Sequence, residues 1–90
     1  MKKIHLSTQY KKDYKRYKQQ LKKLKKLFDI LELLRQGKPI PSDNKPHPLK
    51  GKYQGCLECH IEDDFLLIWI DEVNDIIDLV RLGSHSELFE

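Results

Sequence analysis

Apolar and aromatic positions between residues 8 and 36 recur every three or four residues, which is the period of an amphipathic helix. The recurring residues are Tyr10, Tyr14, Tyr17, Leu21, Leu24, Phe28, Leu31 and Leu34. Lys and Arg fill the other faces, and Gly37 with the prolines that follow it marks the end of the pattern. The sequence therefore predicts helix over 8–36, with Ser7 or Thr8 as the N-cap.

The same periodicity fits either one long helix or a hairpin of two helices, because neither Gly nor Pro interrupts it. A single straight helix of this length would measure about 40 Å. In a chain of 90 residues, two shorter helices can cover one face of a sheet, so we expect a break near Lys18 to Leu21.

The pattern changes to that of strands on both sides of this region. Lys3 to Leu6 alternates weakly and predicts a short first strand. Residues 37–55 hold all four prolines and predict an extended loop. Three later segments are rich in Ile, Leu, Val and aromatic residues and are joined by short acidic turns, which predicts antiparallel neighbours: Gln54 to Ile61, Asp64 to Ile70 and Asp75 to Leu82.

These elements predict one α+β domain over residues 1–90, in which two N-terminal helices form a hairpin packed on a small antiparallel β-sheet. If Glu62-Asp63 and the segment centred on Val73 are the two turns, His60 lies opposite Phe65, and Phe65 lies opposite Arg81. The row would place an imidazole, an aromatic ring and a guanidinium side by side. A slip of one residue in either turn would scatter it.

Charge is divided sharply along the chain, although the net charge is only +3. Residues 1–30 carry eleven Lys and Arg against two Asp, whereas residues 53–90 carry ten carboxylates and the single cation Arg81. The basic half is suited to a polyanion. Arg81 is either a functional cation or a partner of nearby Asp78 or Glu58 in a surface ion pair.

The chain shows no apolar stretch long enough for a membrane span or a signal peptide, so we expect a cytoplasmic protein that does not engage a membrane. Cys56 and Cys59 are too close together for a stapling disulfide and are expected to be reduced thiols on opposite faces of a strand. A zinc site using both cysteines with His60 and His47 would require a knuckle in place of that strand. We expect no metal and no cofactor.

The histidines suggest a chemistry that needs no metal. RNA can be cut through its own 2′-hydroxyl if a base, an acid and a cation surround the phosphate. Histidine suits both proton transfers near neutral pH, and His47, His60 and His85 all fall in the half that holds Arg81. Phe65 or Phe89 offers a ring for stacking a base. The alternative is that each histidine is an ordinary polar residue, that Asp64 only closes a turn, and that the lysines only solvate the helices.

Three motifs resemble the YafQ-like branch of the RelE superfamily of toxins: HPLKG at 47–51, ECHIEDD at 58–64 and RLGSHSELF at 81–89. The resemblance covers the whole chain. It implies two N-terminal helices on an antiparallel sheet, a ribosome-dependent endoribonuclease that cuts mRNA in the A site, and a hetero-oligomeric complex with a cognate DinJ-type antitoxin.

The resemblance also implies roles for individual residues. Arg81 would stabilise phosphate charge and His85 would transfer a proton, with His60 and Asp64 assisting and His47 as a second base or substrate contact. Phe65 and Phe89 would contact the substrate. Two positions depart from the family pattern: Leu57 falls where an arginine is frequent, and Phe65 replaces a tryptophan. The alternatives are a ParE-like toxin that acts on gyrase, whose relatives lack the histidines, and a non-catalytic RNA or ribosome binder.

Overall fold

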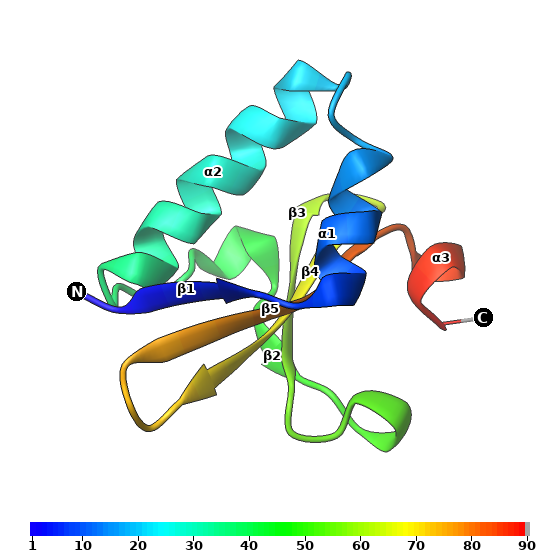
Figure 1. Ribbon diagram of the computed structural model, residues 1–90. Coiled ribbons are helices and arrows are strands. Elements are labelled where there is room, and N and C mark those ends of the chain that lie inside the picture. Colours follow the sequence, from blue (N-terminus) through cyan, green and yellow to red (C-terminus); the bar gives the residue numbers. More distant parts are fainter. Residues whose placement is uncertain (90) are drawn as a thin grey trace.

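The sheet has five strands in the spatial order β1-β5-β4-β3-β2, and the computed structural model describes residues 1–89 (Figure 1). The strands are β1 (Lys3–Leu6), β2 (His47–Pro48), β3 (Leu57–Glu62), β4 (Phe65–Glu72) and β5 (Ile76–Gly83). The predicted antiparallel pairing of β3 with β4 and of β4 with β5 is confirmed. The expectation of a purely antiparallel sheet is wrong, because β1 pairs with β5 in parallel. Parallel pairing needs a long crossover, and the chain between these strands supplies it.

The helical hairpin is confirmed, with α1 at Thr8–Lys15 and α2 at Leu21–Arg35. Ser7 is the N-cap of α1, and its hydroxyl accepts the Tyr10 N–H at 2.9 Å. Figure 1 shows both helices on one side of the sheet, with the short helix α3 (His85–Phe89) beyond the end of β5. Within residues 1–89, no helix is both long and apolar enough to cross a bilayer.

The segment 37–55 is more ordered than the loop that its composition predicts. It contains two single-turn 3₁₀ helices, Ser42–Asn44 and Gly51–Tyr53, and between them the two-residue strand β2. β2 pairs with β3 so that His47 lies opposite Glu58. This pairing anchors the proline-rich segment to the edge of the sheet and brings a histidine beside β3.

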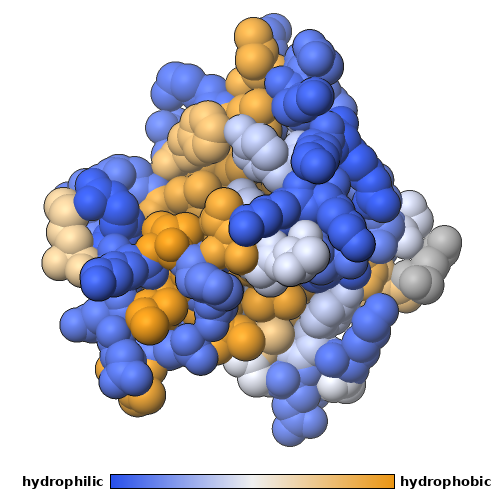
Figure 2. All heavy atoms as spheres, viewed as in Figure 1, coloured by the Kyte–Doolittle hydropathy of each residue, from blue (hydrophilic) through white to orange (hydrophobic). Residues whose placement is uncertain are grey.

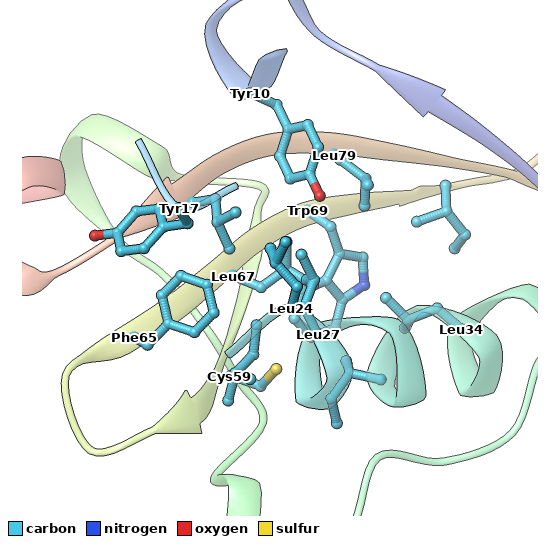
Figure 3. Close-up of a cluster of buried hydrophobic side chains, with 14 residues drawn as sticks. Tyr10, Tyr17, Leu24, Leu27, Leu34, Cys59, Phe65, Leu67, Trp69 and Leu79 are labelled. Atoms are coloured by element: carbon cyan, nitrogen blue, oxygen red, sulfur yellow. The ribbon is translucent and has the colours of Figure 1, made fainter. Parts of the chain in front are cut away.

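Alternation along the strands divides the core into two clusters. The larger cluster lies between the sheet and the two helices, and Figure 3 shows Leu24, Leu27 and Leu34 of α2 pointing at Cys59, Leu67 and Trp69 of the sheet. The smaller cluster lies on the opposite face and consists of Tyr53, Cys56, Leu66, Ile68 and Leu88. The helices therefore cover one face, while α3 and the residues before β3 partly cover the other.

The predicted row of His60, Phe65 and Arg81 is wrong, because both turns lie one position or more from their predicted places. The first turn is Asp63-Asp64, so His60 pairs with Leu66 and Phe65 with Glu62. The second hairpin has a three-residue turn that ends on Asp75 in the left-handed region (φ 58°). A further irregularity beside Ile68 leaves Arg81 opposite Ile68.

Phe65 is fully buried among the helix-side residues, so its expected role as an exposed stacking surface is also wrong. Its ring centroid lies 4.6 Å from that of Tyr17, as Figure 3 illustrates. Because the turn lies one residue later than predicted, the Phe65 side chain is on the helix side of the sheet and not on the side of His60. Phe65 contributes to packing and leaves substrate contacts to other residues.

Replacing Phe65 with Ala should therefore destabilise the fold by about 3–5 kcal/mol, since a buried aromatic ring leaves a cavity when it is removed. Urea unfolding followed by circular dichroism measures the change. Val73→Ala is the matched control, because Val73 is fully exposed at the β4–β5 turn and should leave stability unchanged. A Phe65→Ala protein as stable as the wild type would contradict the burial.

Candidate active site

Three histidines from three separate elements meet on the side of the sheet opposite the two long helices. His47 comes from β2, His60 from β3 and His85 from the start of α3. The ring centroids of His47 and His60 are 6.4 Å apart, and those of His60 and His85 are 5.7 Å apart. The fourth histidine, His5, lies away on β1 beside Asp78. The structure thus brings together the three histidines that the sequence singled out and leaves the other aside.

Asp64 orients His85 rather than His60. Its Oδ1 atom accepts the backbone N–H of His85 at 2.8 Å and lies 2.8 Å from Nδ1 of the same ring. The hydrogen bond from the His85 backbone N–H, and to a smaller extent the one from its ring, lowers the pKa of Asp64 below its usual value. A carboxylate on Nδ1 holds the proton there and leaves Nε2 of His85 unoccupied for a substrate.

Helix α3 is fixed by a reciprocal capping box formed by Ser84 and Glu87. The Ser84 N–H donates to Glu87 Oε1 at 2.8 Å, and the Glu87 N–H donates to Ser84 Oγ at 3.2 Å. The Tyr17 hydroxyl from the segment after α1 also donates to Glu87. Gly83 allows this close approach, because a Cβ there would lie 2.7 Å from Glu87 Oε1 and the backbone has φ +156°. The position of His85 therefore depends on contacts with the helical hairpin.

Arg81 is not a free cation, since most of its guanidinium is bound to Asp13. Nε donates to Asp13 Oδ2 at 2.7 Å and Nη2 donates to Oδ1 at 3.2 Å. Asp13 lies in α1 and is fully buried. The expected surface pairing with Asp78 or Glu58 is wrong, because the partner comes from the first helix.

Asp13 also takes the place of a missing strand partner. Its Oδ2 accepts the N–H of Leu82 at 3.0 Å, on the edge of β5 where the pairing with β1 has ended. Burial raises the pKa of Asp13, but the hydrogen bonds from Arg81 and from the Leu82 N–H outweigh it and hold this pKa below its usual value.

Tyr53 and Phe89 extend the site along α3. Nη1 of Arg81 donates to the Tyr53 hydroxyl at 3.0 Å, and that hydroxyl donates to the Leu88 carbonyl at 2.8 Å. The Phe89 ring packs edge-on against Tyr53 and has its centroid 6.1 Å from that of His85. Since Phe89 is 44% exposed, it offers the accessible aromatic surface that Phe65 does not.

Sequence reasoning missed Glu58 as a member of the site and treated it only as a possible partner of Arg81. It lies on β3, is 3% exposed, and has Oε1 at 3.3 Å from His47 Nε2 and 3.9 Å from His60 Nε2. The signal was its spacing, because position 58 is two residues from His60 and so shares its face of the strand.

The two cysteines lie on opposite faces, as predicted. Both are free thiols, with Cys59 in the helix-side cluster and Cys56 in the smaller one. Burial, with a contribution from the charge of Glu58, raises the pKa of Cys59 to about 12. Among residues 1–89, no group of three or more His, Cys, Asp or Glu side chains has the arrangement of a metal site.

The geometry is that of a small α+β protein with three imidazoles and two carboxylates gathered on one face of the sheet, groups of the kind that can take up and release protons. The model of the family described as "Bacterial toxin of type II toxin-antitoxin system, YafQ" matches residues 2–90. The mRNA interferase toxin YafQ of Escherichia coli K12 is 34% identical over 87 residues, which cover 96% of this chain and 94% of the relative. The chain belongs to the YafQ family of type II toxins.

Solved structures agree with this assignment. The crystal structure of YafQ from Escherichia coli BL21(DE3) matches with a TM-score of 0.89 and 30% identity over 100% of both chains. A crystal structure of the Escherichia coli DinJ-YafQ complex matches with a TM-score of 0.85 and 31% identity, again over 100% of both chains. The family and the fold that the sequence motifs implied are both confirmed.

Replacing Asp13 with Asn should lower the free energy of unfolding by about 3 kcal/mol at pH 7, because it leaves the Arg81 guanidinium without its charged partner. The pKa of Asp13 is lower in the folded protein than in the unfolded chain, where it is about 3.9. The ionised Asp13 therefore stabilises the fold fully at a pH above the unfolded-state pKa, and this stabilisation is lost as the pH falls through the folded-state pKa. The difference between wild type and variant should therefore shrink below about pH 4.

Urea unfolding at a series of pH values measures this difference. Asp43→Asn is the control, because Asp43 is exposed and should show no difference at any pH. A difference between wild type and Asp13→Asn that persists undiminished in acid would show that the ion pair is not its source.

Proposed function

We propose that this toxin cleaves messenger RNA in the ribosomal A site by acid–base chemistry, with the 2′-hydroxyl of the RNA as the nucleophile. The chain belongs to the YafQ family, whose Escherichia coli members are named mRNA interferase toxins, and it is therefore an endoribonuclease of that class. The observation that carries the proposal is the cluster of His47, His60 and His85, in which Asp64 is bonded to His85.

The reaction requires two proton transfers. A base takes the proton of the 2′-hydroxyl, the 2′-oxygen bonds to phosphorus, the bond from phosphorus to the 5′-oxygen breaks, and an acid protonates that leaving oxygen. The products are a 2′,3′-cyclic phosphate and a 5′-hydroxyl end. Because imidazoles can perform both transfers, the reaction as proposed needs no metal.

His85 is assigned to proton transfer at the scissile phosphate. The Asp64 carboxylate on Nδ1 directs the open Nε2 toward the substrate and stabilises the ring when it becomes charged, as a carboxylate does in an Asp–His pair. His60, whose ring lies between the other two, contacts the phosphate from the sheet. His47, on the edge strand β2, is the third histidine of the cluster and serves as a second base or a substrate contact.

Arg81 and Phe89 have supporting roles. Arg81 is 15% exposed and bound to Asp13, so it adds positive charge near the phosphate while also fixing the site's framework. Phe89 provides the accessible face on which a base adjacent to the cut can stack. Phe65 has no direct part, because its ring is buried in the core.

The basic helices supply the affinity for the ribosome. Lys22, Lys25 and Lys26 on α2 line a surface hollow beside Glu62 at the end of β3, and Lys23 and Lys26 form ion pairs with Glu62. Contacts of this kind with RNA phosphates are independent of sequence and position the protein rather than select a codon. Since the substrate is an mRNA under translation, the protein acts in the cytoplasm.

A DinJ-type antitoxin is the proposed protein partner, and it forms a hetero-oligomeric complex with the toxin. A largely apolar groove of about 470 Å³ lies between α1 and α2, lined by Leu6, Tyr10, Tyr14, Phe28 and Leu31 with Lys11 and Lys15 at its rim. Figure 2 shows this hollow as an apolar area framed by hydrophilic side chains. An amphipathic antitoxin segment with acidic flanks matches both the apolar floor and the basic rim.

His85→Ala should lower the rate of mRNA cleavage by about 10² or more, because it removes the group that transfers a proton at the phosphate. Primer extension on a translated mRNA incubated with ribosomes measures the cuts, beside a reaction without ribosomes. His5→Ala is the matched control, since His5 lies outside the site and should cut at the wild-type rate. Undiminished cleavage by His85→Ala would remove the assignment, and growth arrest without any cuts would favour a non-catalytic or gyrase-directed toxin.

Phe28→Glu should weaken antitoxin binding at least tenfold, because it places a charge in the apolar groove where Phe28 is 50% exposed. Isothermal titration of the purified toxin with its cognate antitoxin measures the affinity. Val73→Glu introduces the same charge at the distant β4–β5 turn and should bind as the wild type does. Equal weakening by both variants would point to net charge rather than to the groove.

A further inference from the structure

The guanidinium of Arg81 has one N–H group left over once its contacts with the protein are assigned. A guanidinium carries five N–H groups. Nε and Nη2 donate to the carboxylate of Asp13 at 2.7 and 3.2 Å, and Nη2 also donates to the Glu87 carbonyl at 3.4 Å. Nη1 donates to the Tyr53 hydroxyl at 3.0 Å. Within residues 1–89, the second N–H of Nη1 has no acceptor.

The hydroxyl of Tyr53 fixes the direction of Nη1. A phenolic hydroxyl can accept and donate a hydrogen bond at the same time. This one accepts from Arg81 on β5 and donates to the Leu88 carbonyl on α3 at 2.8 Å. A phenylalanine ring would fill the same space and make neither bond, so the hydroxyl itself links the guanidinium to α3.

The backbone that carries Tyr53 is held in place. Tyr53 is 8% exposed and ends a single-turn 3₁₀ helix. The segment around it is closed at its base, because the Leu49 N–H donates to the Cys56 carbonyl at 2.9 Å. Gly55 has a φ of 93°, in the region that favours glycine, and so turns the chain back toward β3. The hydroxyl is therefore presented from a fixed position.

Tyr53 also touches the exposed ring of the site. The rings of Tyr53 and Phe89 meet edge to face, with centroids 5.4 Å apart, and the Phe89 ring lies 6.1 Å from that of His85. The partner of Arg81 is thus joined to the histidine cluster through one aromatic contact. The Arg81 side chain is 15% exposed although its carboxylate partner Asp13 is fully buried, so a ligand held at these residues can reach the guanidinium.

We propose that Tyr53 is a positioning residue that directs the free Nη1 N–H of Arg81 at one of the two non-bridging oxygens of the scissile phosphate. The inference rests on the proposed ribonuclease function and adds a stereochemical preference to it. One fixed donor can serve only one of the two oxygens. Negative charge grows on these oxygens as the 2′-oxygen bonds to phosphorus, so the hydrogen bond is strongest in the transition state.

A purely structural role for Tyr53 would be to hold α3 in place, and Tyr17 allows the two roles to be separated. The Tyr17 hydroxyl also binds α3, through the Glu87 side chain, and it makes no contact with Arg81 within residues 1–89. Loss of either hydroxyl removes a bond to α3. Only loss of the Tyr53 hydroxyl releases Nη1.

The test uses a synthetic mRNA with a single phosphorothioate at the cut site, placed on the ribosome as each of its two separated diastereomers. Sulfur accepts hydrogen bonds weakly. The wild type should therefore cut one diastereomer about tenfold more slowly than the other, which is the effect of losing a hydrogen bond from a charged donor. In Tyr53→Phe this ratio should fall toward one. On the all-oxygen mRNA, kcat of Tyr53→Phe should fall about tenfold with KM unchanged.

Tyr17→Phe is the matched control and should keep the wild-type ratio of the two diastereomers, whatever its overall rate. Circular dichroism verifies that each variant is folded. A wild-type ratio in Tyr53→Phe would overturn the proposal, and so would an equal loss of the ratio in Tyr17→Phe. Equal cutting of both diastereomers by the wild type would overturn it without any variant. A wild type that leaves the all-oxygen mRNA uncut would refute the proposed function itself.

Discussion

The ion pair between Asp13 and Arg81 joins the two halves of the molecule. Asp13 is fully buried in α1 and binds both the guanidinium of Arg81 and the edge N–H of Leu82, so it fastens the helical hairpin to β5 at the point where β1 stops. Arg81 continues the chain of contacts to Tyr53, whose hydroxyl reaches the carbonyl of Leu88 in α3. A buried charge without its partner is strongly unfavourable, so this connection favours one arrangement of helices, sheet and α3 over any other.

The site depends on that arrangement because its histidines come from elements far apart in sequence. β2 is only two residues long, yet it places His47 against Glu58. α3 is a single short helix, and its capping box and the Tyr17 hydroxyl orient it so that His85 meets Asp64. Short elements of this kind have little stability of their own, so the accuracy of the site comes from the core beneath it.

Much of the fold was predictable from the sequence, since the helix period, the strand segments and Ser7 as the cap all reflect local patterns. The register was not, because the position of the turn decides it and Glu62, Asp63 and Asp64 are all good turn residues. The parallel pairing of β1 is a long-range feature without a local signal. Asp13 was detectable: it lies three residues after Tyr10 and four before Tyr17, on the buried stripe, where a carboxylate requires a cation. Composition and motif correctly grouped the three histidines, whereas the predicted row of His60, Phe65 and Arg81 was wrong.

The parallel pairing of β1 with β5 bears on how the protein is made. β1 precedes the other strands in the chain, and its neighbour in the sheet is β5, which follows them all. During translation β1 stays unpaired until β5 has been synthesised, and Asp13 likewise stays without its partner until Arg81 has been added. His85 follows both. A nascent chain that still lacks β5 and α3 therefore has no assembled histidine cluster and no folded sheet.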